Sequence, residues 1–363
     1  MSFQADLKQF SPQVFPASYQ GGRGLWAAAL AALAGPVAGR DFAHPEDPEL
    51  VCQTAWIGDP AASRVLVVIA GTHGVEGFVG TAIEVDFLGL LTTGDLRLPE
   101  DTAALLVNAL NPWGYAHCRR CDHEGIDTNR NFIDFSRPPP ANTGYLRLMP
   151  IFAIEDHQRR LQLLAEQASA MGQRDYEIAF SGGQFSDPGG PFYGGAAPGF
   201  SRRVIEALMA DHQLGSRRLA VVDIHSGLGP FGYGEVICDH PAASAGIEVA
   251  FSWYGDACTL PASGTSSSVP KLGLLDYAWH RIMDSNSCFV TLEFGTLGTG
   301  PLFEVLLDEA RLWARGDQDN IRERQQMAER MRAHFYPQDP WWREAVIFRG
   351  RQVLRQALSG VAV

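Results

Sequence analysis

Residues 64–77 read RVLVVIAGTHGVEG, and this stretch decides the fold. Its first part, up to Gly71, is a short β-branched apolar run, a pattern typical of a strand that is buried on both faces. Helical patterns, with apolar residues three and four positions apart, separate this run from similar runs later in the chain. Strands that alternate with helices predict an α/β fold, with a mixed, twisted sheet flanked by helices.

These two patterns place the other expected elements. Further strands are expected at residues 103–110, 219–225, 235–238 and 288–294. Helices are expected at residues 77–91, 145–171, 201–211, 301–315, 317–335 and 340–358. The Ala-rich stretch 25–39 is shorter than the roughly 18 to 20 residues that a membrane span needs, and glycine and proline interrupt it. We therefore expect it to be a packed helix.

The chain shows neither a linker nor an internal repeat, although two segments are rich in loop-forming residues. Residues 137–142 read RPPPAN, and residues 181–200 contain seven glycines and three prolines, too many for a regular element. We predict one domain over residues 1–363, with a long loop insertion at about 137–200.

Composition limits the classes of function. The chain is 46% hydrophobic and 19% charged, as in soluble globular proteins. Its 29 basic and 41 acidic residues give a net charge of -12, which repels phosphate backbones and anionic membrane surfaces. We expect neither nucleic acid nor membrane as a partner. The N-terminus lacks the features of a secretory signal peptide, so we expect a cytoplasmic protein.

The six cysteines are expected to remain thiols in a reducing compartment. Cys118 and Cys121 form a CxxC motif, which can be redox-active or contribute half of a zinc site. No second CxxC is present to complete a tetrahedral set. We therefore predict a structural or incidental role for this pair.

The segment GTHGVEG places His73 and Glu76 directly after the first expected strand, where a helix begins. Ligands of open α/β sheets bind at such strand ends. An imidazole and a carboxylate three residues apart can bind one ion. A helix-capping carboxylate near a surface histidine is the alternative for an isolated motif of this kind.

The segment VVDIHSGLG ends another apolar strand with His225, and Asp223 lies on the same strand face. His225 can be a third ligand, because two nitrogens and one carboxylate leave a fourth position for water, as in catalytic zinc sites. The alternative is a core histidine that is hydrogen-bonded to Asp223.

In CFVTLEFG, Glu293 is the only charged residue of an apolar strand. A buried carboxylate is costly unless it is paired, metal-bound or shifted in pKa. Its place at a strand end suits a general base that takes a proton from water. The alternative is a buried ion pair with an arginine.

Residues 111–132, NPWGYAHCRRCDHEGIDTNRNF, bring amide and guanidinium donors together. Guanidinium groups bind carboxylates bidentately and stabilise developing oxyanions. The alternative, solvated surface charge, applies above all to Arg119. Because all four motifs lie at predicted strand ends and supply different parts of one hydrolytic site, chance is a poor explanation of the set.

At these residues the sequence resembles the zinc carboxypeptidase superfamily, which includes the M14-type metallopeptidases and the aspartoacylase-like deacylases. Within it, the chain is most similar to a bacterial group of carboxypeptidase-like proteins (DUF2817-like). The matching segments span about residues 60–358: GTHGVEG, NPWGYAHCRR, DTNRNF, FYGG, HSGLG, TLEFGT and DPWWREAVIFRGRQVLRQAL. The family usually has Leu where this chain has Thr128.

The resemblance implies a fold of the zinc carboxypeptidase type, with an α/β/α arrangement and one Zn²⁺ per chain. The implied zinc ligands are His73, Glu76 and His225. Glu293 would be the general base, and Arg120, with Arg119 as competitor, would polarise the scissile carbonyl. Asn129 and Arg130 would bind the carboxylate of the substrate. Asp127 would orient the first histidine.

The resemblance implies a zinc-dependent hydrolase that cleaves an amide bond next to a free carboxylate, with a small peptide or an acylated amino acid as substrate. One alternative is an N-acyl amino acid deacylase of the aspartoacylase or succinylglutamate desuccinylase type. Another is a catalytically inactive carboxylate-binding protein. The resemblance does not assign the family's substrate-covering tyrosine; Tyr254 and Tyr277 are candidates. We expect the loop 181–200, with its aromatic residues, to form a wall or lid of the pocket.

Overall fold

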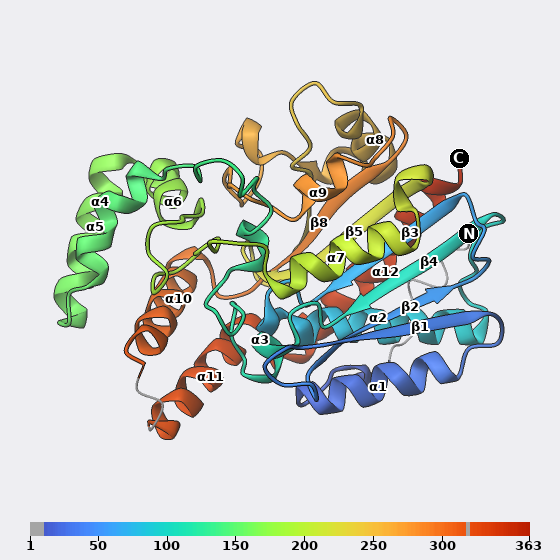
Figure 1. The fold of residues 1–363 in the computed structure, drawn as a ribbon, viewed down its shortest axis with the longest axis horizontal. Coiled ribbons are helices and arrows are strands. Elements are labelled where there is room, and N and C mark those ends of the chain that lie inside the picture. The colour runs from blue at the N-terminus through green and yellow to red at the C-terminus, as the bar shows by residue number, and fades with distance from the viewer. Residues whose placement is uncertain (1–10, 317–319) are drawn as a thin grey trace.

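The structure, a computed structural model, describes residues 11–316 and 320–363. Its centre is an eight-stranded mixed sheet in the order β1-β2-β4-β3-β5-β8-β6-β7 (Figure 1). The four central strands β4, β3, β5 and β8 are parallel, while β2 and β6 run antiparallel to them. The strands span Val37–Ala43 (β1), Val51–Ile57 (β2), Arg64–Ala70 (β3), Thr102–Asn108 (β4), Arg218–Gly227 (β5), Gly234–Ile237 (β6), Cys258–Thr259 (β7) and Cys288–Gly295 (β8).

Helices flank the sheet on both faces. They span Tyr19–Ala31 (α1), Gly77–Thr93 (α2), Pro112–Ala116 (α3), Thr143–Phe152 (α4), His157–Met171 (α5), Gln173–Ser181 (α6), Phe200–Asp211 (α7), Ala245–Tyr254 (α8), Asp276–His280 (α9), Thr299–Ala314 (α10), Ile321–Phe335 (α11) and Pro340–Ala362 (α12). Helices α2, α8 and α12 pack on one face of the sheet, with α1 beside α2, and α7 and α9 pack on the other. The predicted fold class is confirmed.

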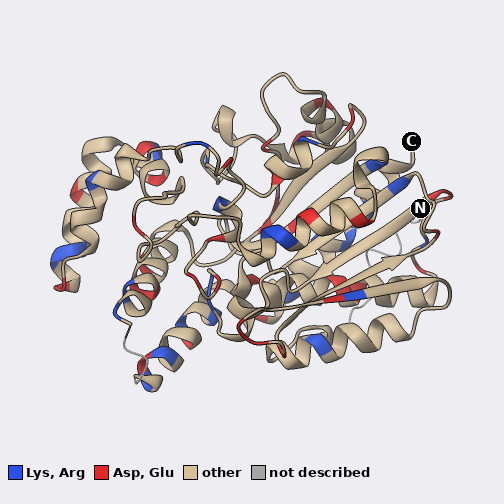
Figure 2. Cartoon of the chain, viewed as in Figure 1, with Lys and Arg blue, Asp and Glu red and all other residues tan. Residues whose placement is uncertain are grey.

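Alternating side chains explain the two layers. Along β3, Leu66 and Val68 belong to the core beneath α2 and α12, whereas Val65, Val67 and Ile69 belong to the core beneath α7. Figure 2 shows that the central strands carry almost no charged residues along their length. Charges therefore gather on the helices and near the carboxyl ends of the strands.

Several expected elements need correction. The stretch 25–39 is not one helix, because α1 ends at Ala31 and β1 begins at Val37. Strands β1, β2 and β7 were not expected from the sequence, since β1 is largely exposed and β7 has two residues. The expected helix 317–335 is observed from Ile321, and residues 317–319 lie outside the described part of the chain.

The insertion at about 137–200 is not a loop over its whole length. Helices α4, α5 and α6 occupy much of it and lie beside α10 as a lobe at the end of the sheet (Figure 1). The expected helix 145–171 is divided into α4 and α5 around residues 153–156. Residues 182–199 are irregular, as their glycines and prolines indicate, apart from one isolated bridge between Gln184 and Tyr193. No helix within the described ranges has the length and apolarity to cross a membrane.

A buried carboxyl group lies inside the packed face of α2. Glu84 is 0% exposed, between the helix and the sheet. Burial raises the pKa of Glu84 well above its usual value, and the nearby Trp26 indole and Val107 backbone offset this only in part. The folded protein therefore holds this carboxyl group in its protonated, neutral form.

We predict that Glu84→Gln stabilises the folded state at neutral and alkaline pH. The unfolded chain loses the Glu84 proton above a pKa of about 4.3, whereas the folded chain keeps it. The free energy of unfolding of the wild type therefore falls as pH rises from that value towards the raised folded pKa, while the amide has no proton to lose. Denaturant unfolding should show a gain on the order of 1–3 kcal/mol at pH 8 and a smaller gain at pH 5.

The matched control for this comparison is Glu329→Gln, because Glu329 is exposed on α11. This variant should give no gain that grows with pH. Suppose that the free energy of unfolding of Glu84→Gln exceeds that of the wild type by the same amount at pH 5 and pH 8. Glu84 would then not be a buried neutral carboxyl group.

Candidate metal centre

The turn after β3 supplies two candidate ligands. The strand ends at Ala70, and a 3-10 turn over Gly74–Glu76 leads into α2. His73 precedes this turn and Glu76 is its last residue, and both are buried. An imidazole and a carboxylate thus lie where strand meets helix, as expected. Because His73 is buried, the alternative of a surface histidine beside a capping carboxylate is not observed.

A second segment fixes this turn in place. The N–H groups of Gly74 and Val75 donate to the carbonyl oxygens of Arg120 and Arg119 at 3.1 and 2.7 Å. A Cβ atom on Gly74 would lie 2.1 Å from the carbonyl carbon of Gly114, so only glycine allows this approach. The turn after β3 and the segment after β4 therefore form one rigid unit.

Strand β5 supplies the third candidate ligand, His225, which is also buried. Because side chains alternate along a strand, Asp223 lies on the same face, and its Oδ2 is 2.7 Å from His225 Nε2. Thr72 donates to the other oxygen of Asp223 at 2.7 Å. The contact with Asp223 leaves Nδ1 of His225 free to face the turn after β3.

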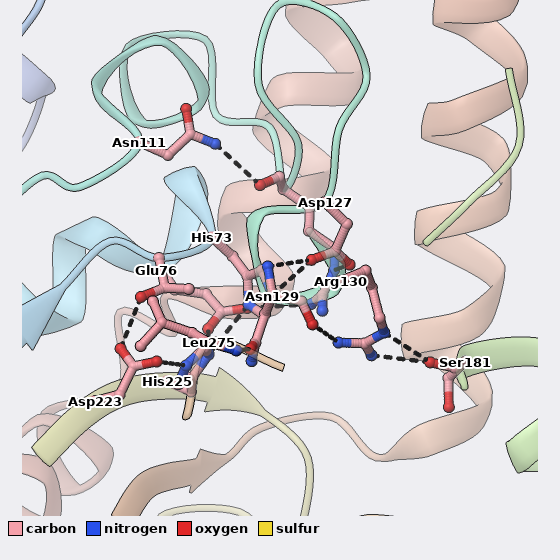
Figure 3. Close-up of polar contacts among 12 residues, drawn as sticks. His73, Glu76, Asn111, Asp127, Asn129, Arg130, Ser181, Asp223, His225 and Leu275 are labelled. Carbon is pink, nitrogen blue, oxygen red and sulfur yellow. Dashed lines mark hydrogen bonds and ion pairs between the residues drawn. The ribbon is translucent and has the colours of Figure 1, made fainter. Parts of the chain in front are cut away.

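The three side chains converge on one point (Figure 3). His73 Nδ1 and His225 Nδ1 are 3.1 Å apart, and each is 2.9 Å from an oxygen of Glu76. Tetrahedral zinc, with bonds of about 2.0 to 2.1 Å, separates its ligand atoms by about 3.3 Å. Two imidazole nitrogens and a carboxylate at these separations fit zinc with only small displacements.

Other groups of potential ligands in the described part of the chain are less enclosed. One group consists of Asp122, His123 and Glu124. The other consists of His157, Glu304 and Asp308. Both groups are partly exposed. By contrast, all three members of the group at β3 and β5 are buried. Burial favours a bound cation here, because buried carboxylates need a partner.

The charge state of Glu76 suits a ligand. Burial alone would raise its pKa, but the neighbouring imidazoles of His73 and His225 hold the pKa of Glu76 well below its usual range. Arg120 Nη1 lies 3.5 Å from Glu76 Oε1. Glu76 is therefore an anion, as metal binding requires.

Each histidine has a carboxylate behind it. Asp127 Oδ1 lies 3.2 Å from His73 Nε2, and Asp223 Oδ2 lies 2.7 Å from His225 Nε2. Carboxylates in this position fix the tautomer of metal-binding histidines and raise their basicity. The structure thus brings Asp127 to the place that the resemblance assigned to it.

Glu293 lies beside His225, because the two residues pair across the parallel strands β8 and β5. The Leu228 N–H donates to Glu293 Oε1 at 3.0 Å. Burial, followed by the negative charge of Glu76, raises the pKa of Glu293 to about 7. Among the described residues no arginine lies within ion-pair distance of Glu293, contrary to the alternative of a buried ion pair.

The adjacent arginines have different partners. Arg119 forms a buried ion pair with Glu309 and stacks over the Trp313 ring. Arg120 donates from Nε to Asp127 Oδ2 at 2.9 Å and lines the same cavity as Glu76. Of the two, Arg120 is therefore the one that can reach a substrate.

Arg130 is wholly buried, with its guanidinium group held by backbone oxygens. Nε and Nη2 donate to the Ser181 carbonyl at 3.2 and 2.8 Å, and Nη1 donates to the Asn129 carbonyl (Figure 3). It forms no ion pair with a carboxylate of the described residues. The Asn129 Oδ1 accepts from the Leu275 N–H at 2.8 Å, and its amide nitrogen makes no hydrogen bond with them. This cation lacks a direct counterion in the described chain.

These groups line one cavity. The loop 181–200 forms part of its wall through Ser181 and Phe192. The Phe192 ring lies 5.0 Å from the guanidinium carbon of Arg120 and 5.4 Å from that of Arg130. The loop is thus a packed wall, and its backbone is tied to Asp127 through the Tyr193 carbonyl at 2.7 Å.

Neither tyrosine considered from the sequence lines this cavity. Tyr254 is buried in the core beneath α12, and the Tyr277 hydroxyl donates to the backbone oxygen of Lys271 at 3.0 Å. Sequence reasoning missed four ionisable residues that do line it: Glu177, Asp239, Lys271 and Asp276. None stands in a strand-end motif, so only their positions in the fold reveal them.

The sheet order and the flanking helices define a carboxypeptidase-like α/β fold. The structure is similar to carboxypeptidase A from Helicoverpa armigera, with 14% identity, a TM-score of 0.50, and 91% of this chain and 78% of that chain covered. Bovine thrombin-activatable fibrinolysis inhibitor, solved in complex with tick carboxypeptidase inhibitor, is 12% identical with a TM-score of 0.48. The match covers 89% of this chain and 98% of that chain. Succinylglutamate desuccinylase from Chromobacterium violaceum has 14% identity, a TM-score of 0.38 and coverage of 87% and 74%.

The chain belongs to the family described as protein of unknown function (DUF2817), whose profile matches residues 15–349. A comparison with curated proteins gives no match. The predicted DUF2817-like group is confirmed, and the similarity to carboxypeptidase A supports the predicted carboxypeptidase-like fold.

We predict that the purified protein binds about one zinc ion per chain, because its two imidazoles and one carboxylate leave a fourth position open. His73→Ala and His225→Ala should each remove most of the metal that elemental analysis detects after zinc supplementation. Cys118→Ser is the control and should keep it. A wild type without transition metal, or loss of metal in the cysteine variant, would refute this ligand set.

Proposed function

We propose that the protein is a zinc-dependent hydrolase that cleaves an amide bond next to a free carboxylate, as carboxypeptidases do. One observation carries this proposal: a buried ligand group, the carboxylate of Glu293 and the guanidinium of Arg130 line the same cavity. Each supplies a different requirement of the reaction.

The proposed metal site consists of His73, Glu76 and His225. Zinc held there supplies Lewis-acid chemistry and lowers the pKa of water. Asp127 and Asp223 keep the two imidazoles oriented for this role. The buried position of all three ligands keeps competing water away from the reacting atoms.

Glu293 is the proposed general base. It accepts a proton from the attacking water and then passes this proton to the leaving amine. A pKa of about 7 suits a group that both takes and gives a proton near neutral pH. The Leu228 N–H holds one carboxylate oxygen, so the other can face the substrate.

The two cavity arginines have separate proposed functions. Arg120, oriented by Asp127, directs its remaining N–H groups at the oxyanion that forms when water adds to the carbonyl. Arg130, together with the free amide nitrogen of Asn129, binds the carboxylate of the substrate. Bidentate guanidinium binding places the adjacent amide bond in a fixed position relative to Glu293.

Deacylation of an N-acyl amino acid uses the same site, because such substrates also have a carboxylate beside an amide bond. Relative kcat/KM values for peptides and N-acyl amino acids separate the two activities. An inactive carboxylate-binding protein is less consistent with Glu293, whose buried carboxylate would then have a cost without a function.

We predict that Glu293→Gln keeps fold and zinc content but lowers kcat about a hundredfold to ten-thousandfold, because an amide cannot accept the proton. Steady-state kinetics, elemental analysis and thermal unfolding measure the three quantities. The exposed Glu206→Gln on α7 serves as the control. A near-normal rate would place the base elsewhere, and an unfolded variant would make Glu293 a structural residue.

We predict that Arg130→Ala and amidation of the substrate carboxylate each lower kcat/KM by roughly 2 to 5 kcal/mol in transition-state stabilisation. Applied together they should cost little more than amidation alone, since amidation already removes the carboxylate that Arg130 binds. Arg147→Ala, at an exposed position on α4, is the control. Equal hydrolysis of free-acid and amidated substrates by the wild type would refute the assignment.

A further inference from the structure

Lysine is rare in this chain and occupies one distinctive position. The sequence contains 27 arginines but only two lysines, Lys8 and Lys271. Lys8 lies outside the described residues, and Lys271 lines the cavity of the candidate metal centre. A compact ammonium group therefore stands in the cavity of a chain that otherwise uses arginine for positive charge.

The contacts of Lys271 leave its charge unpaired. Its Nζ donates to Ser268 Oγ and, at 2.9 Å, to the Val269 carbonyl, both in its own loop. Within the described chain no carboxylate lies within 4 Å of it. An ammonium group has three donors, so one remains for a ligand. Burial, followed by the positive charge of Arg130, lowers the pKa of Lys271 to about 8.

Fastening its own loop does not account for a half-buried ammonium group. The contacts with Ser268 and Val269 span only three residues, and a neutral donor could make either. A partly desolvated charge without a counterion costs free energy that a neutral donor would not. The cost is understandable if a ligand anion completes the pair.

Charges of both signs surround Lys271. Asp239, two residues after β6, is half-buried and makes neither a hydrogen bond nor an ion pair with described residues. Its charge acts on Lys271 and Arg130 without touching either. Burial raises the pKa of Asp276 well above its usual value. Glu293 and Arg120 also act on Lys271 from a distance, so no carboxylate of the described chain is paired with its ammonium group, which can still bind an added carboxylate.

We propose that Lys271 is a substrate-binding residue whose ammonium group shares the free carboxylate of the substrate with the Arg130 guanidinium. This inference rests on the proposed function, in which Arg130 binds that carboxylate. It adds a residue that no motif marks, and it explains why two like charges are held in one cavity. Asp239 adds a negative charge near both cations, which disfavours a second carboxylate on the substrate and so favours terminal residues with an uncharged side chain.

The scarcity of lysine permits a direct spectroscopic test. Full-length, zinc-loaded protein produced with ¹³Cε-lysine should give two lysine resonances, and Lys271→Arg identifies the one from the cavity. We expect saturable addition of 3-phenylpropanoate to shift the Lys271 resonance and to leave that of Lys8 unchanged. The neutral analogue 3-phenylpropanamide should shift neither.

Calorimetry with the same two probes measures what the contact contributes. Lys271→Met should weaken 3-phenylpropanoate binding about tenfold to a hundredfold, as expected for a charge-assisted hydrogen bond, without changing the affinity for the amide. Lys271→Arg should retain most of the affinity. Asp239→Asn should have the opposite effect, with tighter carboxylate binding and improved binding of the dicarboxylate phenylsuccinate. Thermal unfolding of each variant reports any purely structural effect.

The outcomes separate this inference from the proposed function. If 3-phenylpropanoate binds, but the Lys271 resonance does not shift and Lys271→Met binds it equally well, Lys271 is a structural residue and the inference fails. Arg130-dependent hydrolysis can still occur in that case. If Lys271 responds to the carboxylate while no amide substrate is hydrolysed, the inference stands and the hydrolase proposal fails.

Discussion

The buried carboxylate of Glu76, held between two imidazoles, is the interaction on which the site depends. Around it lie two further carboxylates, Asp127 and Asp223, and one arginine in contact, Arg120. Three buried anions exceed one permanent cation, so this cluster needs additional positive charge. A divalent cation would supply it and leave the imidazoles neutral as ligands. The same carboxylates thus explain both the burial of the site and its demand for a cation.

The parallel arrangement of the central strands makes this cluster possible. Strands β3, β5 and β8 end at the same edge of the sheet, so residues far apart in the sequence meet there. His225 and Glu293 are neighbours by strand register, while His73 reaches them from the turn after β3. The segment after β4 then closes the site, because its backbone carbonyls bind the N–H groups of that turn. The turn requires glycine at position 74, where it lies against Gly114.

The parts of this site that could be predicted from the sequence are those that break a pattern. A charged Glu293 within an apolar strand, or His73 where a β-branched run ends, stands out because the surrounding pattern is strong. Strand β1 could not be found in this way, since an exposed edge strand lacks the apolar signal of a central one. Within 137–200 the sequence indicated a helix at 145–171, but not its break between α4 and α5 nor the separate helix α6. Lys271 was missed for a related reason, because a polar loop gives no contrast against which one charge is visible.

Arg119, Arg120 and Arg130 show why chemistry cannot be assigned from residue type alone. All three are buried, and all three come from one segment after β4. Arg119 is neutralised by Glu309 and Arg120 is oriented by Asp127, whereas Arg130 is held only by backbone oxygens. Carbonyl dipoles position a guanidinium group without cancelling its charge. A buried cation that is positioned but not neutralised attracts an anion from outside the chain. Whether a buried arginine is neutralised depends on the carboxylates that tertiary contacts place beside it. Its neighbours in the sequence do not determine this.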